Sequence, residues 1–321
     1  MIHSPNRRQF AQSLLAGGAV AATSHLSFAA QRSLAVRKFT LALTPGSIGV
    51  QVANQMEVIE LAAKYGFESV EPLVEELARS SASQLEELNA VMTAKKLSWA
   101  AAGLSVDFRG DEAKFADGMK ALPAIAAGLQ RAGASRVGTW LMPSHDVLTY
   151  RQNFARHALR LRSIAKVLKD QGLRLGLEYV GTQSLLTRAK YPFLHTMAET
   201  KELISEIGTG NVGFILDTWH WWTAGDTQSD ILSLKNEDVV SVDLNDAPTG
   251  IKRELQQDNQ RELPAATGVI DVKAFLAALK EIGYDGPVRP EPFNRVLNEQ
   301  SNDEACAATI AAMKKAVSTI E

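Results

Sequence analysis

The sequence predicts a single (β/α)₈ TIM barrel, a closed parallel sheet surrounded by helices. Short β-rich runs alternate with longer helical runs eight times over residues 30–321, and strict alternation of this kind is typical of a parallel sheet. Several helical runs end in glycine just before the next strand, as at Gly66, Gly172 and Gly283, which is a common stop signal of helices. Eight repeats in a chain of this length match a closed barrel.

The expected strands are β-rich and largely apolar, and in chain order they are 38–43, 67–72, 97–102, 136–141, 173–180, 212–216, 239–244 and 287–292. The helices expected after them are 56–65, 83–95, 112–132, 150–171, 197–207, 229–233, 272–282 and 302–320. A doubly wound open sheet is the alternative fold. It would require a Gly-rich nucleotide turn after the first strand, but residues 44–49 read TPGSIG and lack the GxGxxG spacing.

Four strands in the second half of the chain end in, or next to, a carboxylate: Glu178, Asp217, Asp243 and Glu291. The C-terminal ends of barrel strands meet on one face, where TIM barrels carry their chemistry. Ionised carboxylates are costly to bury, and four converging carboxylates repel each other unless a cation lies among them. The pattern predicts a divalent metal site, with Mn²⁺ or Mg²⁺ favoured and Zn²⁺ or Co²⁺ possible. Asp246 is an alternative to Asp243, and salt bridges to barrel Lys or Arg are the structural alternative for the whole set.

The same rule assigns further side chains to this face of the barrel. Glu71 follows the second strand, His145 follows the fourth, and His220 lies three residues after Asp217. We expect these three residues to face substrate, with His220 as an alternative fifth metal ligand. We expect the same of Trp219, whose ring would pack on the apolar side of a sugar or, alternatively, cap the barrel against a loop. His157 falls within a predicted helix and is expected at the surface.

A long charged connection, residues 247–268, follows the seventh strand and contains Arg261. Long loops at the active face of a barrel commonly act as lids. We expect Arg261 to bind substrate hydroxyls or to orient a carboxylate, with a solvated surface loop as the alternative.

The N-terminus predicts export. Arg7 and Arg8 precede a short apolar run and the small residues of 27–29, which resembles a twin-arginine signal that is cleaved after Ala29. We therefore expect residues 1–29 to be removed, residues 30–321 to form the barrel domain, and the protein to be periplasmic. The apolar run is too short for a membrane span. The net charge of -2 and the lack of a basic run argue against nucleic-acid binding, and the single Cys306 excludes an intrachain disulfide.

Together these motifs resemble the xylose-isomerase-like sugar isomerase/epimerase family. The matching motifs are VEP, GLEYVG, ILDTWH, VDLNDAP, RELPAATGVID and GYDGPVRPEPF. The resemblance implies that Glu178, Asp217 and Glu291 ligate a metal and that His220 and Arg261 contact substrate. It also implies that Glu178 and Glu291 exchange the proton. One departure is Asp243, which stands where the family usually has a His in a pattern like VHLKD.

We accordingly expect an isomerase or epimerase that acts on a non-phosphorylated keto-sugar by proton abstraction alpha to its carbonyl. A lyase or dehydratase of a 3-keto-glycoside or inosose would use the same metal site. A secreted sugar-binding protein with a degenerate site is the alternative of another class. A metal-dependent phosphodiesterase and a two-carboxylate glycoside hydrolase rank below these. A homo-oligomer is possible.

Overall fold

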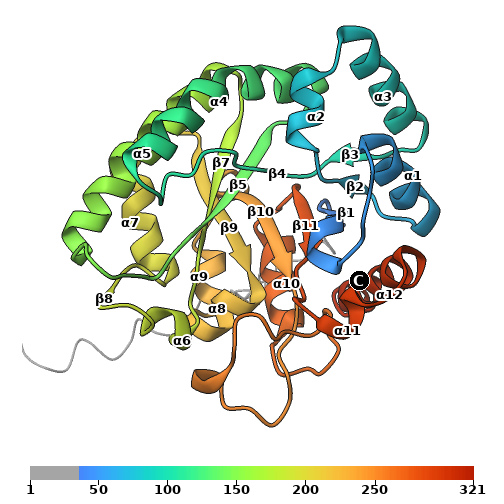
Figure 1. Ribbon diagram of the computed structural model, residues 1–321. Coiled ribbons are helices and arrows are strands. Elements are labelled where there is room, and N and C mark those ends of the chain that lie inside the picture. The colour runs from blue at the N-terminus through green and yellow to red at the C-terminus, as the bar shows by residue number, and fades with distance from the viewer. Residues whose placement is uncertain (1–35) are drawn as a thin grey trace, which may run out of the picture. The chain divides into compact units, whose positions relative to one another are not determined.

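The strands of the computed structural model, which describes residues 36–321, form one parallel sheet that closes on itself (Figure 1). In order around the sheet they are β3 (Ser98–Trp99), β2 (Ser69–Val70), β1 (Thr40–Leu43), β11 (Pro287–Pro290), β10 (Val239–Leu244), β9 (Val212–Asp217), β7 (Arg174–Tyr179), β5 (Arg136–Leu141) and β4 (Ala102–Gly103). The predicted TIM barrel is confirmed. The expected export signal, residues 1–29, lies outside the described residues.

The barrel closes through an interrupted strand. The predicted strand 97–102 is observed as two short pieces, β3 and β4, which are separated only by Ala100 and Ala101. The first piece pairs with β2 and the second pairs with β5. The backbone hydrogen bonds follow this change of partner, because Ala100 N donates to Val70 O at 2.8 Å and Leu104 N donates to Gly138 O at 2.9 Å. The nine strand segments therefore occupy the eight strand positions that the sequence predicts.

The eight expected helices are all present and lie outside the sheet. They are α1 (Gln55–Tyr65), α3 (Ala82–Ala94), α4 (Glu112–Ala132), α5 (Tyr150–Asp170), α7 (Met197–Ile207), α9 (Gln228–Leu232), α10 (Val272–Glu281) and α12 (Asn302–Ser318). Caps define their ends. Asn54 accepts a hydrogen bond from Glu57 N at the start of α1, and Gly66 stops that helix with a φ of 79°. In the part of the chain that the structure describes, no helix is long and apolar enough to cross a membrane.

Several short elements were not expected. They are the helices α2 (Val74–Arg79), α6 (Gln183–Leu186), α8 (Thr218–Ala224) and α11 (Arg295–Asn298), the 3₁₀ turns η1 (Pro45–Ile48), η2 (Asn236–Asp238) and η3 (Arg253–Leu255), and the antiparallel pair β6 (Ser144–His145) and β8 (Tyr191–Pro192). Most of them lie in the connections that follow barrel strands, which is the face where the candidate site forms. Helix α8 begins directly after β9 and carries His220.

Glycines make room for a large side chain inside the barrel. Gly138 and Gly176 are cross-strand partners in β5 and β7. A Cβ atom at Gly138 would lie 2.6 Å from Cδ1 of Ile215, and one at Gly176 would lie 2.8 Å from Cγ1 of the same residue. No side chain fits at such distances without movement of Ile215, so these positions require glycine for packing.

His157 is buried, which corrects the expectation that it lies at the surface. Its side chain is 2% exposed and packs against the rings of Phe108 and Phe193. The amphipathic helix α5 turns this residue toward the barrel rather than toward solvent. Burial, the largest effect, lowers the pKa of His157 to about 3, because a charged imidazolium would lose its hydration.

This depressed pKa predicts a loss of stability in acid. The unfolded chain binds more protons than the folded chain between about pH 6.5 and about pH 3. The contribution of His157 is therefore fully present above pH 6.5 and is lost as the pH falls. Between pH 7.5 and pH 5 the loss should be about 2 kcal/mol, since 1.5 pH units at 1.36 kcal/mol each are crossed below an ordinary pKa of about 6.5. Denaturant titrations at several pH values should show that the free energy of unfolding falls more steeply with acid in wild type than in His157→Gln.

The matched control for that experiment is His195→Gln. A hydrogen bond that His195 donates to the Glu199 carboxylate raises the pKa of His195, so its contribution is present at low pH and is lost as the pH rises. The two variants should change the pH dependence of unfolding in opposite directions. Identical profiles for wild type and His157→Gln would contradict the assignment.

Candidate active site

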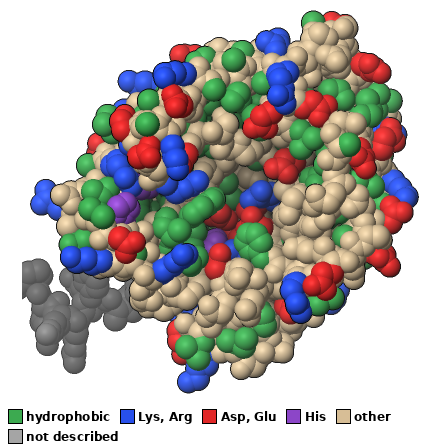
Figure 2. Space-filling model, viewed as in Figure 1, with side chains coloured by type: hydrophobic (Ala, Val, Ile, Leu, Met, Phe, Trp, Pro, Cys, Tyr) green, Lys and Arg blue, Asp and Glu red, His purple; other side chains and the backbone are tan. Residues whose placement is uncertain are grey.

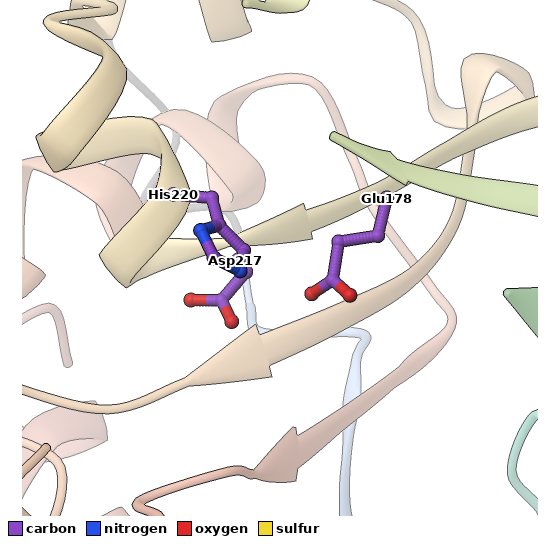
Figure 3. Close-up of side chains that lie close together, drawn as sticks. All are labelled: Glu178, Asp217 and His220. Atoms are coloured by element: carbon purple, nitrogen blue, oxygen red, sulfur yellow. The ribbon is translucent and has the colours of Figure 1, made fainter. Parts of the chain in front are cut away.

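The four predicted carboxylates meet at the C-terminal end of the barrel. Glu178 lies in β7, Asp217 ends β9, Asp243 lies in β10, and Glu291 directly follows β11. These four strands are neighbours in the sheet. One oxygen atom from each side chain lies within 4.8 Å of the others. Figure 3 shows the Glu178 and Asp217 carboxylates directed toward a common space, with His220 beside them.

Two arginines lie among the carboxylates. Nη1 of the buried Arg261 donates to Asp217 Oδ2 at 2.7 Å and to Glu291 Oε2 at 3.0 Å. Arg289 donates through Nε and Nη2 to the two oxygens of Asp243, and through Nη2 to Glu291 Oε1 at 3.1 Å. The structure thus contains some of the salt bridges that were the structural alternative. Two guanidinium groups nevertheless leave two of the four ionised carboxylates unmatched, which is the charge of one divalent cation.

The pKa shifts follow this charge imbalance. Burial, and then the negative charge of Glu291, raise the pKa of Glu178 well above its usual value. Burial, and then Asp243, raise the pKa of Glu291. Burial, the largest effect, disfavours the charged form of Asp217 as well, but Arg261, His220 and the hydrogen bonds that the carboxylate accepts together outweigh it and lower the pKa of that carboxyl. Removing these shifts requires an additional positive charge near Glu178 and Glu291.

An unpartnered oxygen identifies the place where that charge fits. Glu178 Oε1 is buried and has no hydrogen-bond partner within residues 36–321. Its carboxylate and those of Asp217 and Glu291 form an oxygen donor set suited to a hard or borderline divalent cation. The residues present therefore fit a metal ion, and Glu178 is the best-placed candidate to hold it.

Asp243 departs from the expectation of a simple fourth ligand. It is fully buried and lies within reach of the other three carboxylates. Both of its oxygens, however, accept hydrogen bonds from Arg289, its direct cross-strand partner in β11. Asp246, the other expected candidate, accepts hydrogen bonds from the backbone amides of Thr267, Gly268 and Ile270. Asp246 therefore holds the long loop and does not join the carboxylate cluster.

His220 is buried beside the cluster. Its Nδ1 accepts a hydrogen bond from Gly181 N at 3.3 Å, and its Nε2 lies 3.2 Å from Arg261 Nη2. Burial, the largest effect, lowers the pKa of His220 to about 4 despite the nearby Asp217. A neutral ring in this position suits a residue that contacts substrate, and it provides a further ligand atom near Glu178 and Asp217.

A cavity of about 560 Å³ opens from the cluster. Glu178, His220, Arg261 and Glu291 line it, and Figure 2 shows acidic, basic and histidine side chains gathered in a hollow on this face. The long loop contributes Asp258, whose Oδ1 accepts a hydrogen bond from Arg261 Nη2 at 2.9 Å. The loop after β10 therefore borders the site, as expected of a lid, and Arg261 ties it to the carboxylates.

The aromatic wall differs from the expectation. Trp219 is fully buried, its indole N–H donates to Thr182 at 2.9 Å, and its ring lies 5.3 Å from the Arg261 guanidinium carbon. It therefore supports Arg261 and does not line the cavity. Trp140 and Phe293, which are 40% and 38% exposed, line the cavity instead. Trp140 is the last but one residue of β5, a position that strand alternation alone did not distinguish.

His145 and Glu71 do not line the main cavity. His145 accepts hydrogen bonds from the backbone N–H groups of Val147 and Leu148 at its Nδ1, so it stabilises the turn that follows β6. It does not line the 560 Å³ cavity. Glu71 lines a neighbouring cavity of about 490 Å³. Burial, the largest effect, and Asp243 raise its pKa, which places Glu71 close enough to the cluster to sense its charge.

The fold and the carboxylate cluster define a parallel barrel with a candidate active site, and comparison with known proteins identifies the family. The profile of the family described as "Xylose isomerase-like TIM barrel" matches residues 59–316. The chain belongs to this family. A solved xylose isomerase domain protein from Alicyclobacillus acidocaldarius is 28% identical, with a TM-score of 0.76 over 88% of this chain and 99% of that one.

The curated relatives are enzymes. The inosose isomerase of Bacillus subtilis is 29% identical over 151 residues, which is 45% of this chain and 49% of the relative. The 3-dehydroshikimate dehydratase of Pseudomonas aeruginosa is 28% identical over 136 residues, which is 42% of this chain and 20% of the relative. The match thus spans about half the length of the inosose isomerase and less of the dehydratase. Both names refer to compounds with a carbonyl group on a carbon ring.

Proposed function

We propose that this protein is a metal-dependent isomerase or epimerase that moves a proton next to the carbonyl of a keto-sugar or keto-cyclitol. The observation that carries the proposal is the pair Glu178 and Glu291. Two strands, β9 and β10, separate the strands that bear them, so the two carboxyl groups approach the cluster from opposite sides. Both have raised pKa values, which is a property of groups suited to accept and return protons near neutral pH.

Glu178, Asp217 and Glu291 would hold the metal ion. When bound, a divalent ion supplies a Lewis acid that stabilises negative charge developing on the substrate oxygen. Glu178 would take the proton from the carbon next to the carbonyl on one face, and Glu291 would return it from the other side. Return to the same carbon gives an epimer, and return to the neighbouring carbon gives an isomer.

The remaining side chains bind and orient the substrate. Arg261 holds Glu291 and Asp217 in place and connects them to the long loop through Asp258. His220 presents a neutral ring to the cavity. Trp140 and Phe293 offer apolar surfaces that suit the C–H face of a sugar ring and help to exclude water.

Elimination is the second candidate, because one relative is a dehydratase. The same first step would remove the proton, and a hydroxyl or glycosidic oxygen on the next carbon would then leave. Incubation of the metal-loaded protein with a panel of keto-hexoses, inososes and 3-keto-glycosides in D₂O, read by NMR, separates the outcomes. Isomerisation or epimerisation should place deuterium alpha to the carbonyl and leave all hydroxyl and glycosidic groups on the substrate. Elimination should release water or an alcohol. Binding without any exchange would support a sugar-binding protein instead.

We also propose that the protein is exported in the folded state by the twin-arginine route, on the basis of Arg7, Arg8 and the small residues before position 30. Replacing both arginines with Lys should retain the protein in the cytoplasm, because this route requires the arginine pair. Cell fractionation with an immunoblot measures the distribution. Lys38→Arg is the matched control outside the expected signal and should be exported normally. Equal periplasmic recovery of the double variant would contradict the proposal.

A further inference from the structure

A second cavity adjoins the carboxylate cluster and is not explained by metal binding. It has a volume of about 280 Å³ and shares Trp140, Glu178 and Glu291 with the main cavity. Its other walls include Arg289 and Ser241. Gly103 and Gly138, which lack side chains, also line it. This cavity therefore lies directly beside the atoms that the proposed chemistry uses.

Arg289 is fixed by hydrogen bonds from Nε and Nη2, and its remaining nitrogen, Nη1, is still able to donate. Its Nε and Nη2 donate to Asp243, and Nη2 also donates to Glu291. Nη1 has no hydrogen-bond partner among the described residues 36–321, and 21% of the side chain remains exposed. Two N–H donors of a positioned guanidinium are thus available at the cavity.

Ser241 supplies a second unused group. It precedes Asp243 by two residues in β10, so both side chains are directed to the same face of the sheet. Ser241 is 1% exposed, and its Oγ has no hydrogen-bond partner in the described part of the chain. A buried hydroxyl without a partner is rare and calls for an explanation. Glu178 Oε1, in the wall of the same cavity, is unpartnered as well.

We propose that Arg289 and Ser241 form a substrate subsite that donates hydrogen bonds to an uncharged oxygen, a hydroxyl or carbonyl group of a polyhydroxylated ring. This inference rests on the proposed function and names its substrate class. Asp243 and Glu291 already balance the charge of Arg289, so the subsite offers hydrogen bonds without a net positive charge. The two carboxylates that the arginines leave unmatched would already balance a bound divalent ion, so a substrate carboxylate beside Glu178 and Glu291 would find no unpaired positive charge. The subsite therefore favours neutral keto-cyclitols and keto-sugars over ring acids such as 3-dehydroshikimate.

Asp243 acquires a specific role from this arrangement. It is the positioning residue that fixes the guanidinium of Arg289 in a bidentate pair. The pair joins directly opposed residues of β10 and β11, so the two positions act as a unit. Arg289 in turn adds a positive charge beside the metal ligands, which weakens rather than strengthens their attraction for a cation.

Ser241→Ala provides the cleanest test. The full chain, loaded with Mn²⁺, is titrated calorimetrically with 2-keto-myo-inositol and, separately, with 3-dehydroshikimate. Wild type should bind the neutral ring at least about 10-fold more tightly than the acid. Ser241→Ala should weaken binding of the neutral ring about 3- to 10-fold, since one hydrogen bond is lost, without lowering the melting temperature. Thr309→Val is the matched control, because it removes another buried, unpartnered hydroxyl from α12 and should leave ligand affinity unchanged.

Arg289 is tested by two variants that keep the pair balanced. Arg289→Lys keeps the charge, and the double variant Asp243→Asn/Arg289→Gln removes both charges, so neither leaves Asp243 buried as an unpaired ion. Each should weaken binding of the neutral ring by about 10-fold or more. Metal content, measured by mass spectrometry, should stay at one ion per chain.

Each outcome decides the proposal. Wild-type affinity for the neutral ring in Ser241→Ala and in the double variant would overturn the subsite, and so would tighter binding of 3-dehydroshikimate by wild type. Loss of metal from the double variant would show that Asp243 is a ligand rather than a support for Arg289, and would overturn the assignment too. If wild type binds the neutral ring as expected but exchanges no deuterium from D₂O, the subsite stands and the proposed function fails.

Discussion

Glu291→Gln should lower turnover by roughly 10²-fold or more, the usual scale for loss of a general acid or base. A glutamine keeps the shape of the side chain but neither takes up nor returns a proton. Arg261 and Arg289 would each retain an aspartate partner, Asp217 and Asp243 respectively, so the variant should fold. With a substrate found in the D₂O panel, deuterium incorporation alpha to the carbonyl should fall in parallel with product formation.

Glu299→Gln is the matched control for this experiment. Glu299 lies eight residues further along the chain, and its exposed side chain pairs only weakly with the exposed Arg295. It should turn over substrate at the wild-type rate. If Glu291→Gln formed product at the wild-type rate with normal deuterium incorporation, Glu291 would not carry the proton.

Removing the metal should lower the melting temperature of the wild-type protein. Binding that stabilises only the folded state contributes about 4 kcal/mol when the free ion exceeds its Kd by about 1000-fold. A chelator should remove this contribution, because the four carboxylates would then repel each other with only two guanidinium groups among them. Differential scanning calorimetry with and without EDTA measures the shift.

Glu178→Gln should abolish that sensitivity to chelator. Glu178 forms no ion pair with either arginine, and its Oε1 has no hydrogen-bond partner among residues 36–321, so it is the ligand whose charge is least engaged elsewhere. In the absence of metal the variant should be at least as stable as wild type, since one buried charge is gone. Glu237→Gln, a change at an exposed carboxylate, should respond to EDTA as wild type does. A wild-type protein that contains no metal and ignores both EDTA and added Mn²⁺ would contradict the metal site.

The order of strands and helices could be predicted because each repeat carries its own local signals. Helix α1, for example, has a capping Asn54 before it and Gly66 after it, and both residues act within a few positions of the helix. The carboxylates could be predicted for a similar reason. In a barrel every strand ends on the same face, so an acid at the end of Val212–Asp217 must approach an acid at the end of Arg174–Tyr179.

The partners of these carboxylates could not be predicted in the same way. Arg289 lies in VRPEPF, where an arginine within a short strand gives no local signal of burial. Its meaning appears only when β10 and β11 are placed in register, because Asp243 is 46 residues away in the chain. The expectation that Trp219 lines the cavity differs from the structure for a related reason. The sequence does not show that α8 starts immediately after Asp217 and turns this ring inward.

The interrupted strand β3 and β4 belongs to the weakly paired side of the barrel. Each piece has two residues and pairs with its neighbour over two positions, as β1 does with β2 and with β11, whereas β5 and β7 pair over six. Few hydrogen bonds must break for the sheet to separate on this side, so amide hydrogens there should exchange sooner than those between β5 and β7. Gly103 and Leu104, at the end of β4, line both the 490 Å³ and the 280 Å³ cavities. The side of the barrel with the shortest strand pairing thus also borders the proposed substrate-binding region, so local opening there would change the shape of that region.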